Sequence, residues 1–114
     1  MTDRTAPTLD GPDPLISGAP AAAAAAALAL VLDPLADLSV VSATAVRRYY
    51  GWKVEVQLGS ADARREAATR LGLSEPPDLF GDISRPLAEQ VGTYADIETK
   101  VYSRADGADM AAQA

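Results

Sequence analysis

The longest apolar run of the sequence, residues 20–32, consists mainly of alanine and predicts a helix. Alanine has the highest intrinsic helix propensity, and Pro20 suits the first helical position because its missing N–H has no intrahelical partner there. Four larger apolar residues follow the i, i+3, i+4, i+7 spacing of one buried helix face: Leu28, Val31, Leu32 and Leu35. Pro34 is expected to end the regular helix.

Over residues 38–58 the apolar period changes, and from Trp52 to Leu58 apolar and polar residues alternate, which is typical of a half-buried strand. A strand is predicted over 52–58, with Trp52, Val54, Val56 and Leu58 on its inner face. Another is predicted over 38–46, where β-branched residues are frequent. Two sets of apolar residues leave the register of this strand open, because they indicate opposite faces: Leu38 with Val40, and Val41 with Ala43 and Ala45.

A second helix is predicted between Ser60, a suitable N-cap, and Gly72, a typical C′ residue. Its inner side is expected to carry Ala67, Ala68 and Leu71, and its other side Arg64, Arg65 and Glu66. Residues 74–84 contain two prolines and one glycine and predict a loop. Its apolar residues are expected to pack against the core: Leu79, Phe80 and Ile83.

Alternation returns over 87–94 and 97–104, which predicts a closing hairpin with Ala95 and Asp96 in its turn. The fold class is therefore α+β, with the element order αββαββ. We expect a four-stranded antiparallel sheet with two helices packed on one face. The expected core residues are Trp52, Val54, Val56, Ile97 and Val101.

The composition of the two ends separates them from the rest of the chain. Residues 1–18 are rich in proline, glycine, aspartate, serine and threonine, and predict a disordered tail. Residues 105–114 are predicted to fray at the other end. A single α+β domain is therefore expected over residues 19–104.

The arrangement over residues 20–104 resembles a loose set of short, functionally uncharacterised actinobacterial and actinophage proteins. The resemblance is carried by the alanine-rich helix, the first hairpin, the Arg/Ala helix and a closing hairpin of the GTYADIETKVYSR type. It implies a helix–hairpin–helix–hairpin order. It implies no activity and no catalytic residue.

Charge and composition narrow the function classes. The 114 residues include 10 Lys and Arg and 16 Asp and Glu, for a formal net charge of −6, and neither cysteine nor histidine. Disulfides, thiol nucleophiles, Cys/His zinc sites and histidine-based triads are therefore excluded. No signal peptide is evident, and the apolar run at 20–32 is too short to span a bilayer, so we expect a soluble, cytoplasmic protein without membrane contact.

One basic and aromatic cluster stands out in the middle third of the chain, where the net charge is positive. It consists of Arg47, Arg48, Tyr49, Tyr50, Trp52 and Lys53, and Arg64, Arg65 and Arg70 on the second helix could extend it. Cations that meet phosphates and rings that stack on unpaired bases would suit nucleic acid. Alternatively, Trp52 belongs to the core, the tyrosines flank a turn and the arginines are solvated.

Other candidate chemistry is sparse. Glu75, Asp78 and Asp82 could bind a divalent cation or share a proton, but no calcium-loop spacing is present and a solvated loop explains them. A Ser–Lys dyad would need Lys53 or Lys100, and both fall on the outer face of a predicted strand. No glycine-rich phosphate loop is present. We therefore expect no enzyme, no cofactor and no bound metal.

Two functions remain as hypotheses. The first is a non-catalytic protein-interaction, accessory or regulatory module, whose partner is another protein or a second copy of the chain. The second is a nucleic-acid-binding accessory protein that uses the cluster at residues 47–53. The burial of Trp52 bears on the choice, because a buried ring cannot stack on a base.

Overall fold

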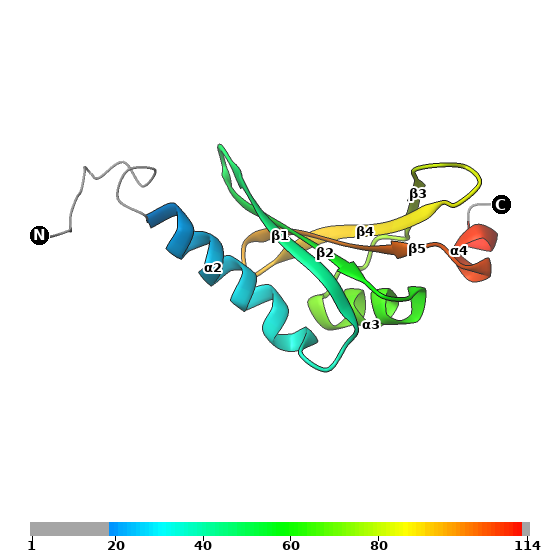
Figure 1. The fold of residues 1–114 in the computed structure, drawn as a ribbon, viewed down its shortest axis with the longest axis horizontal. Coiled ribbons are helices and arrows are strands. Elements are labelled where there is room, and N and C mark those ends of the chain that lie inside the picture. Colours follow the sequence, from blue (N-terminus) through cyan, green and yellow to red (C-terminus); the bar gives the residue numbers. More distant parts are fainter. Residues whose placement is uncertain (1–18, 113–114) are drawn as a thin grey trace, which may run out of the picture.

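The computed structural model describes residues 19–112 and shows an α+β fold (Figure 1). The predicted tail at residues 1–18 lies outside the described residues. The helices and strands follow along the chain as α2 (Ala19–Leu32), the 3₁₀ turn η1 (Asp33–Leu35), β1 (Val40–Arg48), β2 (Gly51–Leu58), α3 (Ala61–Leu71), β3 (Asp78–Phe80), β4 (Leu87–Tyr94), β5 (Ile97–Arg104) and α4 (Gly107–Ala112).

The strands form one mixed sheet of five, in the order β1-β2-β5-β4-β3. The two predicted hairpins, β1–β2 and β4–β5, are both antiparallel, as expected. The prediction of a four-stranded, wholly antiparallel sheet is wrong, because the hairpins join through a parallel pairing of β2 with β5. These two strands contain more buried residues than the other strands of the sheet, and the helices cover them.

The helices α2 and α3 lie on the same face of the sheet, as predicted (Figure 1). A single core cluster joins them to the two central strands. It includes Ala27, Val31, Leu35, Val54, Val56, Leu58, Ala67, Ala68, Leu71, Leu73, Ile97 and Val101. Four of the five expected core residues are thus buried, whereas Trp52, which precedes the first residue of β2 that pairs with β5, is only half-buried.

A β-bulge resolves the register that the sequence left open. Val40 pairs with Leu58, but Ser42 already pairs with Gln57, so Val41 is an extra residue. In a regular strand Val40 and Ala43 would face opposite sides, yet with the bulge both pack against the core. Val41 itself is 61% exposed.

Local capping and turn chemistry hold the predicted elements at their predicted places. The Ser60 hydroxyl accepts a hydrogen bond from the Ala63 amide at 3.0 Å and starts α3, and Gly72 ends it at a φ of 69°. Ala95 and Asp96 both have positive φ, which suits the tight turn between β4 and β5.

Two segments differ from the expectation. Within the predicted loop at 74–84, Asp78–Phe80 forms strand β3 on the edge of β4. Residues 107–112, which were expected to fray, form α4, and its Asp109 is buried. The reason is charge pairing with α3, described below. Over residues 19–112, no helix combines the length and the hydropathy that crossing a bilayer requires.

Candidate functional site

The end of the β1–β2 hairpin projects beyond the rest of the sheet (Figure 1). The first residue of β2 that pairs with β5 is Lys53, opposite Glu98, so the preceding residues have strand-pairing partners only within the hairpin. We call residues 47–52 the hairpin tip. It contains most of the basic and aromatic cluster that the sequence singled out, and it presents that cluster at the end of a projecting arm.

Aromatic side chains dominate the hairpin tip. Tyr49 is fully exposed and Tyr50 is 67% exposed, and their rings meet edge to face with centroids 6.3 Å apart. Trp52 packs one side against the core, and the Arg47 guanidinium lies 5.7 Å from the centre of its ring. The indole therefore has contacts within the chain, whereas the tyrosine rings remain open to a partner.

A hydrogen bond fixes the tip to the body of the sheet. The Tyr50 hydroxyl donates to Oε1 of Glu98 on β5 at 2.6 Å. This bond, which the phenolate could not donate, raises the pKa of Tyr50 above its usual value. Sequence analysis missed Glu98, because the contact depends on the parallel pairing of β2 with β5.

The arginines of the tip have no ionic partner among residues 19–112. Among the described residues neither Arg47 nor Arg48 forms an ion pair, and the buried Nε of Arg48 has no hydrogen-bond partner. The tip therefore carries two positive charges that no carboxylate of the described residues pairs with, in a chain whose formal net charge is −6. This local charge favours an anionic partner.

Arg64 and Arg65, which the sequence grouped with this cluster, belong to a different part of the molecule. Arg64 is fully buried, and its guanidinium binds both carboxylate oxygens of Asp109 on α4. Arg65 contacts Asp106 at 2.7 Å and Asp62 at 2.6 Å. The expectation that Arg64 lies on the outer side of α3 is wrong, and it cannot contribute to an exposed basic surface.

Two further basic residues of the predicted surface are also paired within the chain. Lys53 lies 3.5 Å from Glu55 and 3.7 Å from Glu98. Arg70 bonds to Asp37 and Glu66, the second at 3.0 Å. Of the cations that the sequence grouped together, Arg47 and Arg48 alone remain without an ion pair in the described part of the chain.

The carboxylates at residues 74–84 are solvated. Asp82 accepts hydrogen bonds from the backbone amide and the hydroxyl of Ser84, both at 3.0 Å, and these bonds lower the pKa of Asp82. Glu75 and Asp78 are exposed. Within residues 19–112, no three Asp or Glu side chains come close enough together to hold a metal ion.

Comparisons of the chain with protein-family models, with curated proteins and with solved structures give no match. The resemblance to short actinobacterial and actinophage proteins therefore stays an expectation.

Proposed function

We propose that this protein is a non-catalytic interaction module that binds another protein through its hairpin tip. The observation that carries the proposal is the pair of exposed tyrosines, Tyr49 and Tyr50, beside Arg47 and Arg48. Tyrosine and arginine are enriched among the residues that dominate binding energy at protein interfaces. The projecting hairpin presents them where a partner can surround them.

The charge of the tip supports an acidic partner surface. Arg47 and Arg48 form no ion pair with any of residues 19–112. A carboxylate of the partner could therefore pair with them without displacing a carboxylate of this part of the chain. The bond from Tyr50 to Glu98 holds the turn in place before binding, which reduces the entropy lost on association. The partner is a different protein or an acidic surface of a second copy, and we expect the contact to form in the cytoplasm.

The surroundings of the two lysines support a function without catalysis. A Ser–Lys dyad needs a lysine amine beside a serine hydroxyl. Lys100 instead lies 2.9 Å from Glu89 on the open face of the sheet, and Lys53 faces Glu55 and Glu98. Both ammonium groups are thus engaged by glutamates.

Nucleic-acid binding through the same tip is the alternative function. The exposed rings of Tyr49 and Tyr50 favour it, because they could stack on unpaired bases. The burial and ion pairing of the other basic residues of the predicted surface disfavour it, because affinity for a phosphate backbone grows with the number of Lys and Arg contacts. Arg64 is buried, and Lys53, Arg65 and Arg70 are ion-paired.

Site-specific photo-cross-linking tests both functions. A photoreactive phenylalanine analogue replaces Tyr49 in one variant, and replaces Leu30, which is 52% exposed on α2, in a matched control. We expect protease-sensitive adducts to form in the source cell from position 49 and not from position 30. Nuclease-sensitive adducts would favour the alternative, and equal adduct yields from the two positions would refute a specific role of the tip.

An oligonucleotide titration completes this test. Fluorescence anisotropy with single- and double-stranded oligonucleotides at about 0.15 M salt should show no sequence-specific binding and only weak non-specific binding, because contacts from Arg47 and Arg48 would displace few counterions from the nucleic acid. Binding at micromolar concentration that vanishes when Arg47 and Arg48 are both changed to glutamate would place the nucleic-acid function first. The same pair of substitutions should abolish the protein adducts if the proposed function holds.

A further inference from the structure

Charge pairing, and not apolar packing, attaches α4 to the domain. Of its six residues only Asp109 is buried, and the alanines and Gly107 are exposed. A helix this short is unstable on its own in water. Its position in the structure therefore depends on the few side chains that contact the rest of the chain.

The main contact is an arginine cradle, which we define as Arg64 and Arg65 of α3 together with Gln90 of β4 and Ser103 of β5. The Arg64 guanidinium donates to Oε1 of Gln90 at 3.0 Å, to the Ser103 hydroxyl at 3.1 Å and to Oδ2 of Asp109 at 2.8 Å. Arg64 and Asp109 are both almost wholly excluded from solvent. The neutral groups orient Arg64, and the carboxylate compensates its charge.

A second arginine–carboxylate contact lies beside the first. Arg65 donates to both carboxylate oxygens of Asp106, at 3.1 and 2.7 Å. Asp106 and Asp109 also accept hydrogen bonds from each other's backbone amides at 3.0 Å, which fixes the start of α4. Two carboxylates three residues apart thus fit two adjacent arginines.

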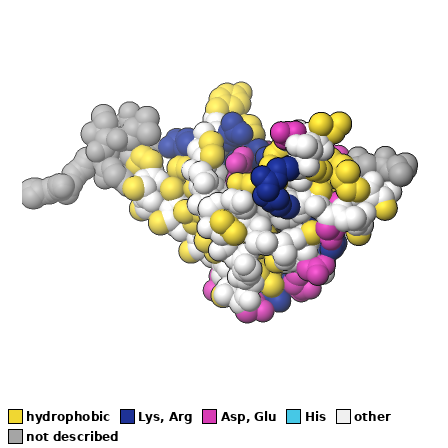
Figure 2. All heavy atoms as spheres, turned by 45° about the vertical axis from the view of Figure 1, so that its right-hand side comes forward, with side chains coloured by type: hydrophobic (Ala, Val, Ile, Leu, Met, Phe, Trp, Pro, Cys, Tyr) yellow, Lys and Arg dark blue, Asp and Glu magenta, His cyan; other side chains and the backbone are white. Residues whose placement is uncertain are grey.

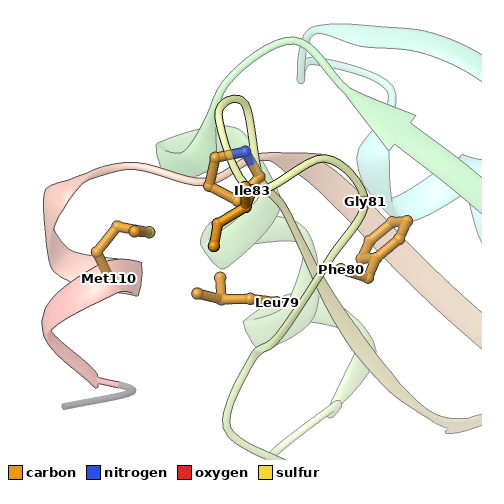
Figure 3. A pocket seen from close by; sticks show the side chains of 6 residues that line it. Leu79, Phe80, Gly81, Ile83 and Met110 are labelled. Carbon is orange, nitrogen blue, oxygen red and sulfur yellow. The ribbon is translucent and has the colours of Figure 1, made fainter.

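An apolar hollow of about 300 Å³ adjoins α4 and is lined by Leu79, Phe80, Gly81, Ile83, Pro86 and Met110. Met110 follows Asp109 directly, and its side chain points toward Leu79 and Ile83 (Figure 3). Met110 does not fill this space, because Ile83 remains 94% exposed and Met110 itself 47% exposed. Hydrophobic side chains gather on the surface at this end of the molecule (Figure 2).

We propose that the arginine cradle and the hollow form a docking site for an acidic segment of a partner protein, and that α4 occupies this site in cis. The matching segment carries two carboxylates three residues apart, followed by an apolar side chain. The carboxylates bind Arg65 and Arg64, and the apolar side chain enters the hollow beside Leu79 and Ile83. The site is separate from the hairpin tip and does not depend on the function proposed for it.

One general energetic argument and one observation favour α4 as an exchangeable ligand over α4 as a permanent part of the core. A buried ion pair gives little net stability compared with apolar side chains of similar volume, but it discriminates strongly for a carboxylate partner. The contact surface of α4 is also small, so a partner segment with a larger apolar side chain would gain contacts that Met110 leaves unused. Because α4 competes for the site from within the same chain, it sets the affinity that a partner segment needs in order to bind.

A labelled peptide tests the proposal on the full-length chain. The peptide has the sequence of residues 105–112, and its binding is followed by fluorescence anisotropy. Peptide binding is measured with the natural chain and with the Asp106→Asn/Asp109→Asn variant. In the variant, the chain's own residues 105–112 should compete more weakly with the peptide. We expect the peptide to bind the variant at least tenfold more tightly than the natural chain.

Three controls separate docking from unspecific association. A peptide with asparagine at positions 106 and 109 should lose binding, and a peptide with Met110→Ser should bind more weakly than the original. Adding Arg65→Ala to the variant should also reduce the affinity. A folded variant that binds the two-asparagine peptide as well as the original peptide, or binds neither, would overturn the proposal.

Hydrogen exchange of the natural chain keeps the proposal testable if the variant does not fold. Displacement requires α4 to detach while the sheet stays folded, so its amides should exchange through local opening, well before those of β5. Equal protection of α4 and β5 would mean that α4 leaves only on global unfolding, and would also overturn the proposal. None of these variants changes the hairpin tip, so the outcome is independent of the cross-linking result.

Discussion

The substitution Asp109→Ala should be the most destabilising single replacement of a carboxylate in this domain, because Asp109 is buried. It removes both carboxylate oxygens from Arg64, which is fully buried, and leaves that guanidinium with only the neutral groups of Gln90 and Ser103. Breaking a buried ion pair from one side typically costs about 3–5 kcal/mol. We expect about 3 kcal/mol, because α4 can detach and admit water to Arg64.

Urea unfolding followed by the fluorescence of Trp52 provides the measurement. Trp52 is the only tryptophan and packs against the core, so its fluorescence reports unfolding of the domain. Asp62→Ala is the matched control, because the Asp62 side chain is 92% exposed and pairs with Arg65 at the surface. Such a surface pair contributes less than about 1 kcal/mol.

A double variant separates the loss of the pair from other effects of the substitution. If the uncompensated charge is the cause, Arg64→Met combined with Asp109→Ala should restore part of the stability lost in Asp109→Ala alone. If Asp109→Ala costs no more than Asp62→Ala, the buried pair does not hold α4 in the way described, and the reasoning fails.

Three further predictions concern other residues. Gly92→Ala should cost about 1–3 kcal/mol in urea unfolding, because an added Cβ would lie 2.9 Å from the buried Leu73 side chain, whereas Gly107→Ala, which meets no atom within 4 Å, should cost nothing. Trp52→Ala should cost about 2 kcal/mol, less than a fully buried tryptophan, and the natural fluorescence should be partly quenched by iodide; full quenching would contradict its packing on the core. Arg65 lowers the pKa of Asp106, so the stability that Asp106 contributes is present above its usual pKa of about 3.9 and is lost as the pH falls below it. The difference in unfolding free energy between the natural chain and Asp106→Asn should therefore shrink between pH 5 and pH 2, and a constant difference would refute the ionic contact.

The parts of the fold that follow local rules could be predicted from the sequence. Alternation located both hairpins, Ser60 and Gly72 delimited α3, and Ala95 and Asp96 were placed in a turn. The joining of the hairpins could not be predicted in this way, because antiparallel and parallel pairing of β2 use the same alternating pattern. Strand β3 has only three residues and follows two prolines, so it gives no periodic signal.

The candidate site was predicted in part. The hairpin tip carries Arg47, Arg48, Tyr49 and Tyr50 together, as their adjacency implied, but Arg64 and Arg65 are directed elsewhere by α3. A signal for Arg64 was present, because it lies at helical spacing from the buried Ala61, Ala68 and Leu71. Its partner Asp109 could not be identified, since an isolated aspartate among small residues near the chain end is typical of a frayed terminus.

The parallel pairing of β2 with β5 also has a kinetic consequence. Each hairpin can form from neighbours in the chain, but paired residues of the central strands, such as Val56 and Val101, are far apart in sequence. Closing that long loop costs entropy before any buried contact compensates for it, and such topologies fold slowly. We therefore expect the two hairpins to form early and their joining to limit the folding rate, so that substitutions in the middle of β2 and β5, which weaken the joining, slow folding.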